Sequence, residues 1–122
     1  MSIRSKYEAE LRLVFDKLVD MCHATEIAIE KSITALRMRD PDLAREVMRE
    51  DRDIDSAERE IEQDCLKILL MERPVASDFR EVSAALKMIT DLERIADQAA
   101  DISEISLQFG EEKFIKEPEH IT

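Results

Sequence analysis

Three acidic residues recur along one face of a predicted helix in the last third of the chain. Glu93, Asp97 and Asp101 follow one another at intervals of four residues. In an α-helix this spacing places them on the same side, with a drift of only about 40° per step. Carboxylates gathered on a helix face that also packs against the core are typical of sites that bind cations. The spacing therefore indicates a carboxylate metal site.

The apolar stripe of the same helix runs directly into this acidic stretch. Its predicted core positions alternate in steps of four and three residues, and Glu93 takes the next position of the series. The two positions that follow are Ala96 and Ala100, which leave space beside the acid. A helix with a charged residue at a core position and small residues beside it more often forms a binding site than an ordinary surface. The predicted core positions before Glu93 are Val75, Phe79, Val82, Leu86 and Ile89.

A second acidic stripe lies in the middle of the chain. At 100° per residue, Asp51 and Glu58 fall inside or against the apolar arc that contains Ile54 and Ile61. If the two helices pack through these faces, their carboxylates meet across the interface. The acids that could meet are Asp51, Asp55, Glu58 and Glu62 on the earlier helix and Glu93, Asp97 and Asp101 on the later one.

Carboxylates gathered in this way repel one another unless they are protonated, paired with Arg or Lys, or neutralised by a metal ion. A ligand set made only of oxygen excludes a structural zinc–thiolate site and favours Mg²⁺, Ca²⁺, Mn²⁺ or ferric iron. The two histidines, His23 and His120, are predicted to face solvent. The predicted metal ligands are Glu93, Asp97, Asp101, Asp51, Asp55 and Glu58.

Two of the three prolines separate the helices that must position these acids. Pro41 follows the N-cap residue Asp40, and Pro74 ends the next helix, so helices are predicted over residues 4–38, 41–72 and 75–108, the last ending before Gly110. Connections this short force antiparallel neighbours. The predicted fold is all-α: an up-down-up bundle of three long helices over residues 1–108. Residues 109–122 are expected to form a linker and the start of a further unit, most of which this chain lacks.

The first helix carries a core stripe without evident chemistry. Cys22 lies on it, and Cys65 lies on the stripe of the second helix, so both are predicted to be buried, reduced thiols. Tyr7 and the methionines are interpreted as packing residues. The predicted stripe of the first helix is Leu11, Phe15, Leu18, Cys22, Thr25 and Ile29.

Composition narrows the classes of partner. The 122 residues carry a formal net charge of −11, which argues against direct binding of nucleic acid because phosphate would be repelled. The same charge favours cations or basic protein surfaces. The N-terminus has no signal-peptide pattern and the longest apolar run covers only residues 68–71, so we expect a cytoplasmic protein.

The acidic segments resemble the PhoU family, regulators of phosphate uptake in bacteria and archaea. The strongest likeness is the stretch over residues 84–97, which ends in Asp-Leu-Glu-Arg-Ile-Ala-Asp. Residues 51–61 resemble the second helix of the family, and residues 74–80 resemble the turn into its third. Ala96 stands where family members usually have Gly, which narrows the room beside the site.

The resemblance implies a chain of two tandem three-helix repeats, of which only one is present here. It also implies an acidic E/D-x-x-x-D motif that binds iron or zinc clusters in some members and other divalent ions in others. Glu93 and Asp97 match that motif, Asp101 extends it by one turn, and Asp51 and Asp55 match the acids of the preceding helix less closely.

In function, the resemblance implies a non-enzymatic adaptor. Such an adaptor couples a phosphate ABC transporter to a membrane sensor kinase and represses the phosphate-starvation response. Contact with the membrane would then occur only through these partners. Because a single three-helix unit would expose an apolar flank, self-association is also expected.

Three alternatives remain open at this stage. The acids could be solvated or paired with Arg52, Arg59, Arg80 and Arg94 on a purely structural helical module. The run from Asp51 to Glu62 partly matches a calcium-binding EF-hand loop, although Ser56 stands where the loop needs Gly. A di-iron carboxylate enzyme would need Glu-x-x-His motifs on paired helices, and the sequence has no such pair.

Overall fold

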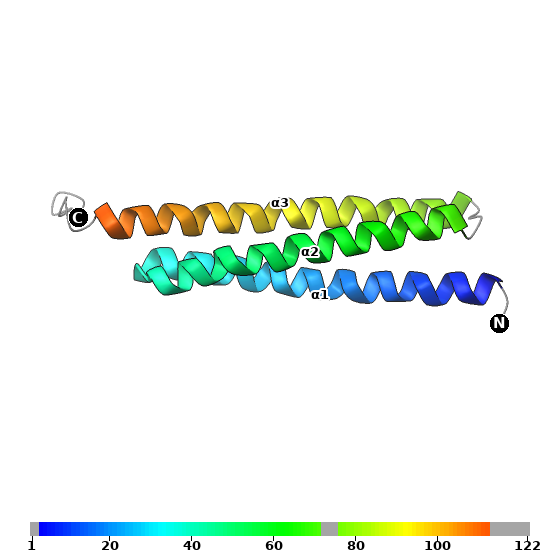
Figure 1. Cartoon of the computed structure of the whole chain (residues 1–122), viewed down its shortest axis with the longest axis horizontal. Helices are drawn as coiled ribbons and strands as arrows, with labels where there is room; N and C mark the ends of the chain where they lie inside the picture. Colours follow the sequence, from blue (N-terminus) through cyan, green and yellow to red (C-terminus); the bar gives the residue numbers. More distant parts are fainter. Residues whose placement is uncertain (1–2, 72–75, 113–122) are drawn as a thin grey trace.

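The fold is a bundle of three long helices. The computed structural model describes residues 3–71 and 76–112. Within these ranges the chain forms α1 (Ile3–Met38), α2 (Pro41–Met71) and α3 (Ala76–Glu112), and contains no strand. α1 and α3 run in the same direction and α2 runs in the opposite one (Figure 1). The predicted all-α, up-down-up bundle is therefore confirmed.

One predicted helix end is wrong. α3 continues through Gly110 to Glu112, instead of ending at residue 108. A single glycine inside a helix costs only about 1 kcal/mol relative to alanine, which a helix of 37 residues tolerates near its end. The rest of the segment assigned to a linker, residues 113–122, lies outside the described residues.

The tight connection between α1 and α2 follows from local chemistry. Arg39 adopts a left-handed conformation, with φ of 55°, and the backbone N–H of Asp40 donates to the carbonyl of Ala35 at 3.0 Å. These are the features of a Schellman C-cap. Asp40 also caps α2, because its Oδ1 accepts a hydrogen bond from the backbone N–H of Leu43 at 3.1 Å. One aspartate thus stabilises the reversal that makes α1 and α2 antiparallel.

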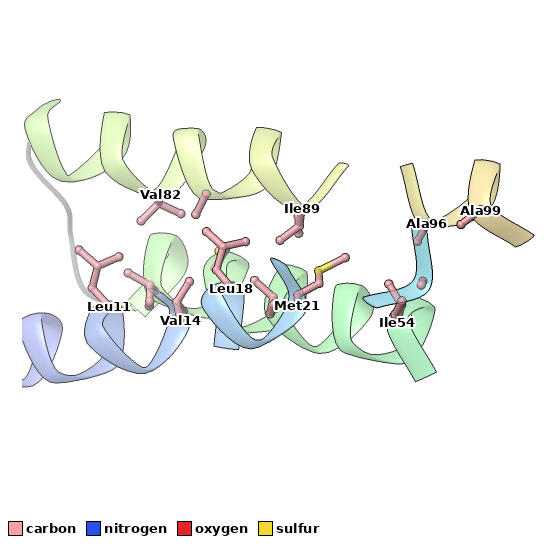
Figure 2. Close-up of a cluster of buried hydrophobic side chains, with 14 of the residues drawn as sticks. Leu11, Val14, Leu18, Met21, Ile54, Val82, Ile89, Ala96 and Ala99 are labelled. Atoms are coloured by element: carbon pink, nitrogen blue, oxygen red, sulfur yellow. The ribbon is translucent and has the colours of Figure 1, made fainter. Parts of the chain in front are cut away.

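The core is built from buried positions that recur every three or four residues on each helix. This is the spacing of helices that wrap around one another with a left-handed twist. Figure 2 shows side chains from α1 opposite Val82 and Ile89 of α3. The buried apolar positions are Tyr7, Leu11, Val14, Leu18, Met21, Ala28 and Ala35 in α1, Ala44, Val47, Ile54, Ile61, Cys65 and Ile68 in α2, and Val82, Ala85, Ile89, Ala96 and Ala99 in α3.

The buried positions of α3 differ from the predicted ones at every second position of the series. Phe79 is 54% exposed, whereas its neighbour Asp78 is buried and accepts a hydrogen bond at its backbone carbonyl from the Tyr7 hydroxyl at 3.3 Å. Ala85 is the fully buried residue where Leu86 was expected, and Leu86 is partly buried and packs against the core cluster. Both neighbours satisfy a spacing of three or four residues, and the close approach of the helices selects the smaller side chain. Ala99 likewise replaces Ala100 in the core.

The predictions for the first helix need two similar corrections. Phe15 is 36% exposed, and Cys22 is only half-buried. Both lie one position beyond the buried residues Val14 and Met21, at the edge of the buried row of α1. Cys65 is buried and free, as predicted, and burial raises the pKa of its thiol to about 11. It is therefore an unreactive packing residue.

Candidate metal centre

α2 carries acids at positions of its own core row. Its row proceeds in steps of three and four residues, and Asp51 and Glu58 occupy the two positions on either side of Ile54. Both acids are partly buried, while Val47 and Ile61 at the neighbouring positions are fully buried. The same periodicity that builds the core therefore directs two carboxylates into the bundle.

The facing segment of α3 combines acids with small residues. Glu93 and Asp97 are partly buried on the flank beside Ala96, which is itself buried. The core position expected for Glu93 is filled by Leu92, which packs against the apolar cluster. Glu93 therefore lies at the edge of the interface and not within the core row. Alanine at position 96 leaves room for the carboxylates of both helices.

Three of the six predicted ligands converge. Asp51, Asp55 and Asp97 each offer a carboxylate oxygen, and these three atoms lie within 4.8 Å of one another. Oδ1 of Asp51 and Oδ1 of Asp55 are buried and lack a hydrogen-bond partner. Buried carboxylate oxygens are normally satisfied by a donor or a cation. The arrangement is therefore that of a small oxygen-ligand site open to a positively charged group.

Within the described residues no basic side chain forms an ion pair with this cluster, although the charge of Arg59 opposes the rise in the pKa values of Asp55 and Glu58. Arg94 pairs with Asp91 at 3.8 Å, and Arg59 donates to the hydroxyl of Ser56 at 3.3 Å. Over residues 3–71 and 76–112, none of the six predicted ligands forms an ion pair. Pairing with arginine, one of the alternatives left open by the sequence, therefore does not explain these acids.

The electrostatics of the cluster favour protons or a cation. Burial raises the pKa of Asp51 to about 6, and the charges of Asp55 and Asp97 add to the effect. Hydrogen bonding to Asp97, followed by burial and the charge of Asp97, raises the pKa of Glu93 to about 7. Burial is also the main reason that the pKa values of Asp55 and Glu58 are raised. The cluster thus holds protons at higher pH than isolated carboxylates do.

The remaining predicted ligands surround the three converging residues. The charge of Glu58 helps to raise the pKa of Glu93, so these two acids lie at one end of the cluster. Asp101 is exposed, and its charge contributes to the raised pKa of Asp51 from the other end. Neither Glu58, Glu93 nor Asp101 belongs to the group whose oxygens lie within 4.8 Å. From the sequence, Asp51 and Asp55 were the less secure ligands. In the structure they are central.

The EF-hand alternative is wrong. The segment from Asp51 to Glu62 lies inside the continuous helix α2, so its acids cannot wrap around one ion as a loop does. Asp53, the third-position ligand of such a loop, is exposed and lines a groove on the opposite flank of α2. Asp51 and Asp55, a helical i, i+4 pair, are the acids of this segment whose oxygens converge with Asp97 of α3.

That groove, of about 470 Å³, lies between α1 and α2 and is separate from the acidic cluster. Its lining is mainly apolar and includes Ala24 and Ala57, and lysine–acid ion pairs lie at its two ends. Lys17 pairs with Asp64 at 2.6 Å at one end. At the other end, Lys31 pairs with Glu46 at 2.7 Å and Glu50 at 2.9 Å. The cations of this flank are thus occupied by acids outside the cluster.

None of the three described helices combines the length and the apolar character that crossing a bilayer requires.

Comparison with known proteins gives a consistent family match. The model of the PhoU domain family matches residues 18–106. Two relatives, both named phosphate-specific transport system accessory protein PhoU homolog, come from Borreliella burgdorferi and Pseudomonas putida. They are 39% and 36% identical over 86% and 90% of this chain. A homolog of the same name from Aquifex aeolicus is 33% identical over 88% of the chain.

These relatives are longer proteins. The matched region covers 48% of the Borreliella protein, 43% of the Pseudomonas protein and 48% of the Aquifex protein. The chain therefore spans about half the length of the curated relatives it matches. The acidic cluster between α2 and α3 lies entirely inside the matched region.

Proposed function

Because this chain belongs to the PhoU domain family, we propose that it is a non-enzymatic accessory unit of a phosphate transport system, with a metal ion bound by the carboxylates of α2 and α3. The proposed metal binding rests on the convergence of carboxylate oxygens from Asp51, Asp55 and Asp97. The names of the relatives support the transport part, since all three are phosphate-specific transport system accessory proteins.

The dimensions of the cluster suit a hard cation. Ca²⁺ binds oxygen at about 2.3–2.6 Å, so ligands on opposite sides of the ion are about 5 Å apart. The ligand oxygens of Asp51, Asp55 and Asp97 lie within 4.8 Å of one another, which allows all three to bind one such ion. Mg²⁺ or Mn²⁺ would need a slightly tighter arrangement. Iron or zinc, suggested by the family resemblance, would use the same carboxylates.

Three further acids would complete the site. Glu58, Glu93 and Asp101 surround the central three and would supply additional ligands or hydrogen-bond acceptors for bound water. The bound ion would neutralise the repulsion that raises the pKa values of Asp51 and Glu93. It would also hold α2 and α3 in a fixed register, because its ligands come from both helices.

The proposed role is that of an adaptor on the cytoplasmic side of the membrane. It would couple a phosphate ABC transporter to a membrane sensor kinase and repress the phosphate-starvation response. Contact with the membrane would occur through those partners. The net charge of −11 supports partners with basic docking surfaces.

Elemental analysis tests the metal site. The 122-residue chain, purified without a tag and dialysed, is compared with the double variant Asp51→Asn/Asp97→Asn. A matched control is Asp53→Asn/Asp91→Asn, which removes the same charge from the same two helices outside the cluster. We expect about one metal equivalent or more in the wild type and the control, and none in the cluster variant. Equal metal content in all three proteins would refute the assignment and favour solvated acids.

Binding to partners tests the adaptor role. The immobilised chain is exposed to the detergent-solubilised phosphate ABC transporter and to the sensor kinase, with and without a chelator. We expect retention of both partners by the wild-type chain. If neither is retained, whether the metal is present or not, this unit does not carry the coupling function.

A further inference from the structure

The groove between α1 and α2, called the α1/α2 groove below, has an apolar lining and acidic rims. Its volume of about 470 Å³ is roughly three times that of a cavity that holds benzene, so it has room for about three large apolar side chains. None of the three converging carboxylates of the metal centre lines it. The apolar residues of its lining are Met21, Ala24 and Ile27 of α1 and Ile54, Ala57 and Ile61 of α2.

The ion pairs at the two ends of the groove show which residues of α1 and α2 lie at the same level. Lys17 pairs with Asp64 at 2.6 Å, and Lys31 pairs with Glu50 at 2.9 Å. Because the helices are antiparallel, the level halfway between the two pairs falls on the middle residue of each segment. These middle residues are Ala24 of α1 and Ala57 of α2. Small side chains at this point allow a third helix to approach closely.

Two acids on the rims of the groove form no ion pair among the described residues. Asp20 of α1 and Asp53 of α2 both line the groove and are exposed. The register set by the end pairs places Asp53 at about the level of Ile27. Asp20 is seven residues from that level, so the two acids lie on opposite rims and about 10 Å apart along the groove.

The charge around the groove favours a basic partner. Each lysine at its ends is shared by two acids, so the end pairs themselves carry an excess of negative charge. Lys or Arg side chains would be attracted to the groove, whereas the phosphates of nucleic acid or of an anionic membrane would be repelled. The acids of the groove and its ends are Asp20, Glu46, Glu50, Asp53, Glu60 and Asp64, and the lysines are Lys17 and Lys31.

We propose that the α1/α2 groove docks a basic amphipathic helix of a partner protein. Three apolar side chains of such a helix, spaced over positions i to i+7, would fill the apolar lining, with the middle one over the two alanines. Positions i to i+7 span about 10 Å, which matches the separation of Asp20 and Asp53 along the groove. A Lys or Arg on each side of the apolar stripe would therefore meet one of these unpaired acids.

Helical peptides displayed on phage test this proposal without a known partner. The library holds 18-residue peptides with Leu at the positions of the apolar stripe and all twenty amino acids at the positions beside it. It is selected against the immobilised 122-residue chain, in chelator and at about 0.15 M salt, where charges about 8 Å or more apart are screened. We expect enrichment of Lys or Arg on both sides of the stripe, about seven residues apart, and loss of Asp and Glu.

Fluorescence anisotropy then measures the affinity of one enriched peptide for variants of the chain. Asp20→Asn/Asp53→Asn should raise the dissociation constant about tenfold, because each of two exposed charge pairs contributes roughly threefold. The control Glu26→Gln/Glu62→Gln removes the same charge from exposed positions of the same helices outside the groove, and should leave the affinity within about twofold.

A third variant, Ala24→Phe/Ala57→Phe, fills the middle of the groove and should abolish binding, with circular dichroism to confirm that the helices remain. A selection without enrichment of basic residues would overturn the proposal. So would equal affinity for the Asp20→Asn/Asp53→Asn variant and the control, or full binding to the folded, filled variant. Since the selection uses neither metal nor transporter, its outcome is separate from the tests of the proposed function.

Discussion

Replacing Asp51 with asparagine should make the metal-free protein more stable and abolish its response to metal. Asp51 lies at a core position of α2, and its pKa is raised from 3.8 to about 6, so at pH 7.5 folding keeps a charge where burial and neighbouring acids disfavour it. For a fully buried group this difference in pKa would lower the free energy of unfolding by about 3 kcal/mol. Partial solvent exposure reduces it to on the order of 1–2 kcal/mol. Asparagine has nearly the same shape and removes that cost.

Thermal unfolding followed by circular dichroism measures this effect. For a domain of this size, 1–2 kcal/mol corresponds to a rise in Tm of about 4–8 °C in the presence of a chelator at pH 7.5. Adding Ca²⁺ or Mn²⁺ should stabilise the wild type through preferential binding to the folded state and leave the Asp51→Asn variant unchanged. Asp53→Asn is the control, because Asp53 is exposed on the other flank of α2. Equal behaviour of the two variants would refute the reasoning.

Two further predictions concern the carboxylate cluster, and a third concerns the N-cap of α2. The Tm of the metal-free wild type should rise when the pH falls from 7.5 to 5.5, because the folded state then binds the protons that the raised pKa values of Asp51 and Glu93 favour, whereas unfolded carboxylates remain ionised. A Tm that is flat or falling over this range would contradict it. Asp97→Asn should lower the pKa of Glu93 from about 7 toward 4.5, measured by ¹³C NMR titration of its carboxyl carbon, with Asp91→Asn as a control that leaves it in place. Asp40→Ala should lower the free energy of unfolding, measured in urea, by about 1 kcal/mol, because the N-cap hydrogen bond of α2 is lost. A loss no larger than that of an exposed surface substitution would contradict this last expectation.

The number and direction of the helices could be predicted because the signals are local. Pro41 with its capping aspartate marks a reversal that side-chain chemistry alone determines. The burial register of α3 could not be read in the same way. Leu86 and Ala85 both fit a three-and-four spacing, and hydrophobicity favours the larger residue. The packed bundle buries Ala85, since the distance between neighbouring helices is a tertiary property that no single helix encodes.

The candidate site illustrates the same limit. Helical angles suffice to place Asp51 inside the apolar arc of α2, because that judgement involves one helix. Which acid of α3 lies opposite depends on how α2 and α3 slide relative to each other. The structure selects Asp97 for the converging group and leaves Glu93 at its edge, with Leu92 in the core position. A shift of α3 by one helical turn, four residues, relative to α2 would bring Glu93 to the place that Asp97 now holds.

α3 therefore presents two different surfaces through residues that are close in sequence. Ile95 and Asp97 are two positions apart, yet about 200° separates them around the helix axis, so Ile95 is an exposed apolar side chain on the flank away from α2 and Asp97 belongs to the carboxylate cluster. An ion held by Asp97 would therefore leave the side of α3 that carries Ile95 uncovered.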